Sequence, residues 1–159
     1  HTCESYIRQH LLCPLAIPDQ RYVGFDSLPT DPQAECRRVA TEIVRRGGID
    51  LAILGIGVNG HLALNEPGTF AHPCCHVAEL APATVEHSML RGVTHGIRRG
   101  ITLGIGDLLQ ARRILLLAFG DQKADAIKRL LKREISPQLP ASFLWLHPHV
   151  TDQEAARRS

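Results

Sequence analysis

The sequence predicts an α/β domain with a parallel sheet between two layers of helices. Residues 49–54 and 113–119 are apolar runs of the kind that buried parallel strands need. Helical patterns precede and follow these runs, and no internal repeat or low-complexity linker interrupts them. Because strands that alternate with helices form a parallel sheet covered on both faces, we expect one three-layer domain.

Two helices are predicted before the first strand. Residues 4–12 have a helical pattern that Pro14 ends. Asp31 is expected to cap the second helix, with Pro32 at its first position and two glycines at 47–48 at its end. The buried stripe of this helix is expected to consist of three branched residues, Val39, Ile43 and Val44.

The second half of the chain continues the alternation. Residues 65–98 are irregular and contain several prolines, and this stretch could cover a site as a lid. A short strand at 101–103 leads into a helix that begins near Gly106, and a helix at 121–132 follows the strand at 113–119. The apolar residues expected to face inward on that last helix are Ala124, Ile127, Leu130 and Leu131.

The segment directly after the strand at 49–54 is the strongest candidate for a functional site. It reads Gly-Ile-Gly-Val-Asn-Gly-His-Leu-Ala-Leu-Asn-Glu-Pro-Gly over residues 55–68, and its glycines allow the chain to turn sharply. In open α/β sheets, ligands bind at this carboxyl edge of the strands. An imidazole, an amide and a carboxylate stand within the loop: His61, Asn59 and Glu66. We therefore expect an active site at the end of the first strand.

The pattern Gly-x-Gly-x-[Asn/Asp]-Gly-His-x-x-x-Asn-Glu-Pro in this loop resembles the signature of the hexosamine-6-phosphate deaminase/isomerases, the glucosamine- and galactosamine-6-phosphate deaminases. Three further stretches are similar to that family in the same order, at residues 102–107, 115–124 and 140–147. The last of them, Pro-Ala-Ser-Phe-Leu-Trp-Leu-His, looks more like the galactosamine-6-phosphate branch, because the glucosamine branch tends to have Gln where Trp145 stands. The resemblance covers nearly the whole chain.

The chemistry of the resembled family needs a proton carrier for ring opening, and His61 is our candidate. Histidine titrates near neutrality, and the family has its ring-opening histidine at the matching position. Glu66 is close enough in sequence to hydrogen-bond this imidazole and to favour its charged form. Asn59 cannot accept a proton, but its amide can orient His61 or a substrate hydroxyl. A core or surface position without catalytic role is the alternative for these side chains.

The resemblance implies a phosphorylated amino sugar as the substrate. We expect the loop glycines Gly57 and Gly60 to lie against it. Lys123 is predicted in the first turn of a helix, where the helix dipole and free N–H groups attract anions, and the resembled family uses this lysine on the sugar phosphate. A solvated surface lysine is the alternative. Met89 stands where many family members have a second phosphate-binding arginine, and Arg91 follows two residues later.

The resemblance also implies that this chain is the C-terminal part of one deaminase/isomerase domain. In the family, the first strands, a phosphate-binding loop and the catalytic aspartate precede a stretch that here lies at residues 1–6. A positioned base and a bound substrate are both needed for catalysis. We therefore expect residues 1–159 alone to release no measurable ammonia.

Composition narrows the partners and cofactors. A net charge of +2 and an aromatic content of 4% argue against nucleic acid, and no apolar run approaches the roughly 20 residues of a membrane span. Five cysteines without framework spacing predict free thiols in a reducing cytoplasm. Residues 72–76, His-Pro-Cys-Cys-His, are read as a surface loop, because adjacent cysteines rarely chelate one metal ion well. No cofactor is expected, and the sequence leaves open whether the protein forms a homo-oligomer.

Two other functions stay open as alternatives. A 6-phosphogluconolactonase shares the expected fold and a similar Gly-x-Gly-x-Asp-Gly-His loop, but there the loop continues into a Ser-Leu-Phe-Pro type of sequence and not into residues 65–67, Asn-Glu-Pro. A non-catalytic sugar-phosphate sensor would lack the pair of His61 and Glu66 or carry a DNA-binding module. We therefore favour conversion of galactosamine-6-phosphate, or glucosamine-6-phosphate, to a ketose 6-phosphate and ammonia.

Overall fold

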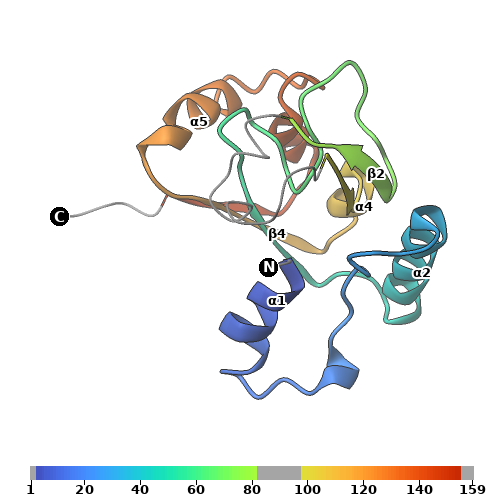
Figure 1. Ribbon diagram of the computed structural model, residues 1–159. Helices are drawn as coiled ribbons and strands as arrows, with labels where there is room; N and C mark the ends of the chain where they lie inside the picture. Colours follow the sequence, from blue (N-terminus) through green and yellow to red (C-terminus); the bar gives the residue numbers. More distant parts are fainter. Residues whose placement is uncertain (1–2, 82–97, 155–159) are drawn as a thin grey trace.

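A parallel sheet of three strands forms the centre of the protein (Figure 1). The computed structural model describes residues 3–81 and 98–154. In the sheet, β4 (Arg113–Ala118) lies between β1 (Leu51–Gly55) and β5 (Val150–Glu154), and both neighbours run parallel to it. The predicted α/β class and parallel sheet are confirmed. The sequence did not predict β5, because its residues Val-Thr-Asp-Gln-Glu are largely polar.

A separate antiparallel hairpin is formed by β2 (His76–Glu79) and β3 (Arg99–Thr102). The expectation that residues 65–98 are irregular is therefore wrong at β2, whereas the strand predicted at 101–103 overlaps β3, which begins two residues earlier and ends one residue earlier. The hairpin is tied to the glycine-rich loop, because the buried hydroxyl of Thr102 accepts a hydrogen bond of 3.2 Å from the backbone N–H of Leu64. With only four residues in each of β2 and β3, neither strand is long enough to show a clear alternation of apolar and polar side chains.

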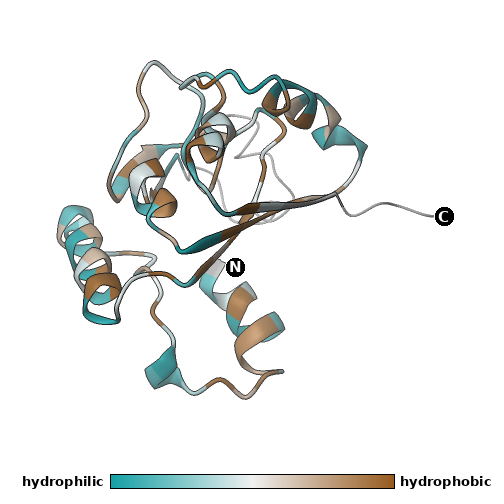
Figure 2. Ribbon diagram, turned by 180° about the vertical axis from the view of Figure 1, so that it is seen from behind, coloured by the Kyte–Doolittle hydropathy of each residue, from teal (hydrophilic) through white to brown (hydrophobic). Residues whose placement is uncertain are grey.

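Three helical segments pack on one face of the main sheet: α4 (Ile105–Leu109), α5 (Ala124–Leu130) and the 3₁₀ segment η4 (Pro140–Leu146). Figure 2 shows hydrophobic residues concentrated along the strands at the centre of the molecule. The sheet residues buried in this core are Ala52, Leu54, Ile114 and Leu116. This packed core fixes the ends of β1 and β4, and the residues of the candidate site lie in the loops that follow these two strands.

The opposite face of β1 is not buried by the described residues. Leu51 is 50% exposed and Ile53 is 61% exposed, so the expectation of a strand buried on both faces is wrong for these two positions. Side chains of a strand alternate between the two faces of its sheet, and the core described above takes only the even-numbered positions of β1. The apolar run identified the strand correctly, but it did not reveal which face would be covered.

Two helices bury different residues from those that their patterns predicted. On α2 (Pro32–Arg45), Val39 is buried as expected, but Val44 is 77% exposed and Cys36 takes its place. This helix packs against the β2–β3 hairpin, so the partner decides which of several apolar rows faces inward. In the helix after β4, Leu130 is buried as expected and Ile127 is partly buried. Ala124 and Leu131 are exposed, contrary to expectation, and Ala126 is buried instead.

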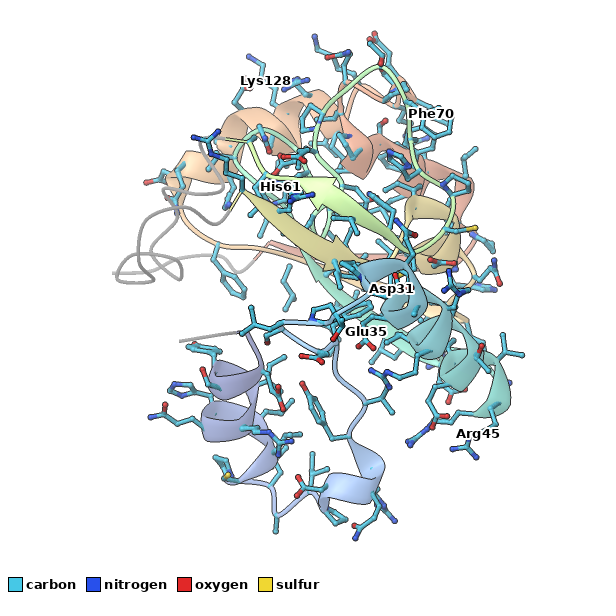
Figure 3. The ribbon with its side chains drawn as sticks, turned by 45° about the vertical axis from the view of Figure 1, so that its right-hand side comes forward. Asp31, Glu35, Arg45, His61, Phe70 and Lys128 are labelled. Carbon is cyan, nitrogen blue, oxygen red and sulfur yellow. The ribbon has the colours of Figure 1, made fainter. Side chains whose placement is uncertain are left out.

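Local signals at the helix ends are confirmed. The N-terminal helix consists of α1 (Cys3–Ile7) and a wider π turn, η1 (Arg8–Leu12), and the chain leaves it at Pro14. Asp31 caps α2, because its Oδ1 accepts hydrogen bonds from the next two free backbone N–H groups at 2.9 and 3.1 Å. Figure 3 shows Asp31 at one end of α2 and Arg45 near the other.

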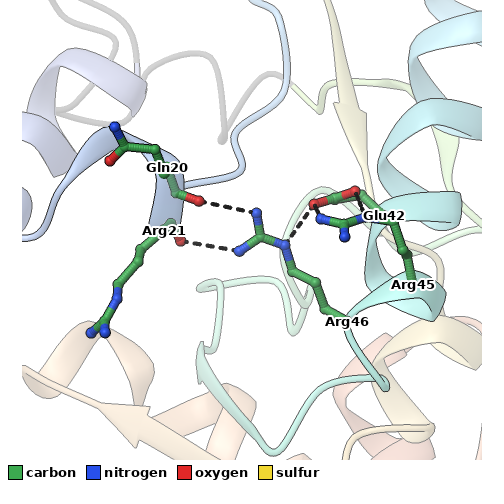
Figure 4. Close-up of polar contacts among 5 residues, drawn as sticks. All are labelled: Gln20, Arg21, Glu42, Arg45 and Arg46. Atoms are coloured by element: carbon green, nitrogen blue, oxygen red, sulfur yellow. Dashed lines mark hydrogen bonds and ion pairs between the residues drawn. The ribbon is translucent and has the colours of Figure 1, made fainter.

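A network of charged side chains attaches the N-terminal segment to the end of α2 (Figure 4). The carboxylate of Glu42 accepts hydrogen bonds from Arg45 and Arg46, and these contacts lower the pKa of Glu42 to about 2. The guanidinium of Arg46 also donates to the backbone carbonyls of Gln20 and Arg21. The short turn η2 (Asp19–Arg21) is thereby connected to α2 by one side chain that serves two partners.

Candidate functional site

The glycine-rich loop after β1 forms a tight turn that is stabilised by backbone hydrogen bonds within the loop and by one from η4. The N–H of Gly57 donates to the carbonyl of His61, and the N–H of Gly60 donates to the carbonyl of Gly57, both at 2.9 Å. Gly60 has a φ of 90°, a conformation that is strained for any residue with a Cβ atom. Its carbonyl accepts a hydrogen bond of 2.9 Å from the N–H of Ala141, which anchors the loop to η4.

The imidazole of His61 lies directly over Gly57. A Cβ atom added at Gly57 would lie 2.6 Å from Cγ of the His61 ring, closer than real Cβ contacts come. A Cβ atom at Gly60 would likewise collide with the side chain of Leu139. The structure thus gives both glycines a packing role, namely making room for the imidazole and for Leu139. Whether they also touch a substrate stays a prediction.

The three predicted polar side chains of the loop come together. The amide Nδ2 of Asn59 donates to Oε2 of Glu66 at 2.9 Å, and Oδ1 of Asn59 accepts from the backbone N–H of His61 at 3.1 Å. Nδ1 of His61 lies 3.4 Å from the same Oε2 of Glu66 (His61 is labelled in Figure 3). Because both ends of the Asn59 amide have partners, this residue fixes the carboxylate and the loop backbone relative to each other.

The pair of His61 and Glu66 is partly shielded but still reachable. The two side chains are 21% and 12% exposed. A carboxylate in this setting can orient the imidazole, while the remaining exposure leaves room for a substrate atom. This arrangement can transfer a proton to or from a bound ligand.

Asn65 shapes the turn from a buried position. Its side chain is buried, and Nδ2 donates to the carbonyls of Leu62 and Leu103 at 3.0 and 2.9 Å. These two acceptors determine the orientation of the amide. The other end of the group, Oδ1, is buried and has no hydrogen-bond partner among the described residues. A buried acceptor without a partner costs free energy.

Lys123 is carried by the loop that follows β4. It ends the 3₁₀ turn η3 (Asp121–Lys123) directly before α5. The sheet register pairs Gly55 with Leu117, so the loop after β1 and the loop after β4 leave the same carboxyl edge of the sheet. Burial lowers the pKa of Lys123. None of the ion pairs within the described ranges involves this ammonium group, which is therefore suited to an external anion.

A hollow of about 310 Å³ lies against Glu66, and sequence reasoning missed it. We call it the histidine hollow, because His72 and His76 line it with their rings stacked at 4.1 Å. Phe70 meets the ring of His72 edge-on at 5.1 Å, and Figure 3 shows Phe70 at the outer edge of the molecule. The aromatic rings at positions 70, 72 and 76 were the sequence signal for this hollow, but their irregular spacing fits neither a helix nor a strand face, so the hollow was not predicted. Neither His61 nor Lys123 lines the hollow.

Other residues singled out in the sequence do not join this site or cannot be placed. Met89 and Arg91 lie outside the described residues. Trp145 contacts the end of α5: its Nε1 donates to the carbonyl of Leu130 at 2.8 Å, and the guanidinium of Arg133 lies 4.5 Å from its ring centre. This tryptophan therefore supports the fold, and its value as a marker of sugar specificity stays a prediction.

The described cysteines are free thiols. They are Cys13, Cys36, Cys74 and Cys75. Burial and the neighbouring Cys36 raise the pKa of the Cys75 thiol, which keeps it protonated and unreactive. The described ranges contain no group of three or more histidine, cysteine or acidic side chains placed to share a metal ion. Within the same ranges, no helix is both long and apolar enough to pass through a bilayer.

Comparison with known proteins identifies the family. Residues 1–153 match the family model described as glucosamine-6-phosphate isomerases/6-phosphogluconolactonase. A protein of Escherichia coli (strain K12) provisionally named deaminase AgaI is 46% identical over 146 residues, which are 92% of this chain and 58% of that protein. A glucosamine-6-phosphate deaminase of Geobacillus sp. (strain WCH70) is 42% identical over 156 residues, covering 94% of this chain and 62% of the relative.

The fold comparison agrees. A monomeric glucosamine-6-phosphate deaminase of the NagB superfamily has a TM-score of 0.84 and 34% identity, with 92% of this chain and 62% of that structure covered. The 6-phosphogluconolactonase of Thermotoga maritima has a TM-score of 0.68 at 24% identity, a likeness of fold alone, over 92% of this chain and 61% of that structure. This chain spans about three fifths of the length of these relatives. Its match over residues 1–153 shows that it belongs to the glucosamine-6-phosphate isomerase/6-phosphogluconolactonase family.

Proposed function

We propose that the protein is a hexosamine-6-phosphate deaminase/isomerase that converts galactosamine-6-phosphate, or its glucosamine epimer, to a ketose 6-phosphate and ammonia. The observation that carries this proposal is the contact of His61, Glu66 and Asn59 within one loop. It is supported by relatives and a structural neighbour that are named as deaminases. The chain covers only part of those proteins, so the activity is proposed for the full-length protein.

In this proposal His61 moves the proton that opens the sugar ring. Ring opening transfers a proton between the ring oxygen and the anomeric hydroxyl, and an imidazole 3.4 Å from a carboxylate is suited to that task. Glu66 orients the ring through Oε2, and Asn59 holds Glu66 in place. The base that transfers a proton between the adjacent carbons belongs, by family resemblance, to a segment outside residues 1–159.

Lys123 is proposed to bind the sugar phosphate. It comes from the same edge of the sheet as His61. Its ammonium group has lost part of its hydration through burial, and a bound anion would compensate for that loss. The galactosamine branch is preferred because of Trp145 and because Met89 stands where an arginine of the glucosamine branch would be. We place the protein in the cytoplasm, where free thiols persist.

The test is an assay of the full-length protein with galactosamine-6-phosphate, glucosamine-6-phosphate and 6-phosphogluconolactone under the same conditions. Ammonia release from either amino sugar, with little lactone hydrolysis, is the expected result. His61→Asn should lower the rate of ammonia release by about 10²–10⁴-fold. The exposed His10→Asn serves as the matched control and should leave the rate unchanged. Lactone hydrolysis without ammonia release would establish the lactonase alternative.

A further inference from the structure

The turn at residues 62–65, which separates the two members of the proposed proton-transfer pair, rests on strand β3. The backbone N–H of Leu64 donates to the hydroxyl of Thr102 at 3.2 Å, and that hydroxyl donates in turn to the carbonyl of Leu103 at 3.2 Å. A Cβ atom added at Gly100 would collide with the side chain of Leu64, so this side chain lies directly on the strand. Positions 100 and 102 share one face of β3, because side chains alternate along a strand.

A second set of hydrogen bonds joins the turn to the same carbonyl group. Nδ2 of Asn65 donates to the carbonyl of Leu103 at 2.9 Å and to the carbonyl of Leu62 at 3.0 Å. The backbone N–H of Asn65 also donates to Leu62, at 2.9 Å, which closes the turn. Thr102 is 3% exposed and Asn65 is 6% exposed, so water scarcely competes for these bonds. The end of β3 and the turn are therefore held together at one shared acceptor.

The backbone of the turn needs this support. Ala63 has a φ of 52°, which lies in the left-handed region that a residue with a Cβ atom disfavours. Such a conformation persists only where the surrounding contacts enforce it. The hydrogen bonds to β3 involve the residues directly after Ala63, namely Leu64 and Asn65. Without these bonds, the chain at Ala63 is free to relax to a negative φ, and the course of the turn would change.

The geometry of the proposed proton-transfer pair depends on the course of this turn. Nδ1 of His61 and Oε2 of Glu66 lie 3.4 Å apart, and the four residues of the turn connect them. Asn59 holds the carboxylate from within the glycine-rich loop, whereas Thr102 holds the turn from a separate strand. Misplacing a reacting group by about 1 Å can cost on the order of 100-fold in rate. A residue that fixes the turn can therefore control proton transfer without touching the substrate.

We propose that Thr102 is a positioning residue of the candidate site: its buried hydroxyl holds the turn at 62–65 on β3 and thereby sets the ring of His61 opposite Glu66. This inference rests on the proposed function. It also gives a role to the first residue of the stretch at 102–107, which resembles the family but which the proposed chemistry had not used.

The test compares two substitutions of Thr102 in the full-length protein. Thr102→Val keeps the shape of the side chain but removes the hydroxyl, and it should lower kcat for ammonia release about tenfold, because the N–H of Leu64 loses its buried acceptor. KM should change by less than about twofold, since the proposed phosphate contact at Lys123 lies outside this network. Thr102→Ser keeps the hydroxyl and should recover most of kcat.

Ile114→Val is the matched control for a general loss of stability. It removes one methyl group from a core residue near the start of β4, at the opposite end of the strand from the candidate site, and should leave kcat unchanged. A normal kcat in Thr102→Val would overturn the proposal. So would a serine variant no better than the valine variant, a loss that appears in KM alone, or an equal loss of kcat in Ile114→Val.

The NMR signals of the His61 ring test the same positioning without an activity assay. These signals are assigned by their absence from the spectrum of His61→Asn, and they should shift in Thr102→Val but not in Thr102→Ser or Ile114→Val. A wild-type protein that releases no ammonia from either amino sugar would contradict the proposed function, and the His61 signals would still decide the role of Thr102. Unchanged His61 signals in Thr102→Val would overturn the positioning role, whatever the activity.

Discussion

Gly57→Ala tests whether the position of the His61 ring matters for catalysis. The new Cβ atom would collide with Nδ1 of His61 and lie 2.5 Å from its Cε1, and ordinary van der Waals contact begins at 3.4 Å, so the ring has to recede by at least about 0.9 Å. Misplacing a catalytic group by about 1 Å can cost on the order of 100-fold in rate. We therefore expect kcat/KM for ammonia release to fall about 100-fold, which corresponds to roughly 2.7 kcal/mol of transition-state stabilisation.

The same loop provides a matched control for this substitution. A Cβ atom at Gly55 would meet nothing within 4 Å, so Gly55→Ala should keep its activity. Both variants should retain a cooperative thermal transition, which is followed by circular dichroism, while ammonia release is followed in a coupled assay of the full-length protein. A near-normal kcat/KM in Gly57→Ala, or an equal loss in Gly55→Ala, would refute the claim that Gly57 exists to seat the His61 ring.

Three further predictions concern charge, core packing and pH. Lys123→Ala should lower kcat/KM for the phosphorylated amino sugar about 10- to 150-fold but scarcely affect the free amino sugar, and equal losses would exclude a phosphate contact. Ser142→Ala should lower the free energy of unfolding by about 1–3 kcal/mol in denaturant titrations, because its buried hydroxyl accepts a hydrogen bond from the backbone N–H of Ser136. An effect no larger than that of Ser27→Ala, which changes an exposed serine, would contradict this prediction. The pKa of His76 is lowered from 6.5 in the folded protein, so the unfolded chain takes up this proton first as the pH falls. The free energy of unfolding should therefore decrease as the pH drops below about 6.5, and His76→Gln should flatten that dependence. An unchanged dependence of the free energy of unfolding on pH in this variant would show that His76 does not cause it.

Features that depend on neighbouring residues were predictable from the sequence. Asp31 caps α2 as predicted, because a cap requires only a side-chain oxygen and the free N–H groups of the next turn. His61, Asn59 and Glu66 meet because glycines fold their short loop back on itself. The contact of these three side chains is therefore largely a local property of residues 55–68.

Features that depend on distant partners were predicted wrongly or not at all. Val44 was expected in the core, but α2 packs on the β2–β3 hairpin and turns Cys36 and Val39 inward. Leu51 and Ile53 belong to a recognisable strand, yet half of that strand faces no described element. Apolar spacing shows that a segment can bury a face, but which face is buried depends on the element that covers it.

By itself, the sequence determined the α/β alternation, the helix cap at Asp31 and the polar composition of the glycine-rich loop, because each of these follows from short-range spacing and backbone chemistry. The tertiary structure alone decided that Lys123 leaves the same sheet edge as that loop, since this follows from the pairing of Gly55 with Leu117. It also decided the existence of the histidine hollow, whose walls come from residues 64–79, Ile105 and two prolines at 137 and 140. A cavity is bounded by residues that only long-range packing brings together, and no periodicity in the chain records it.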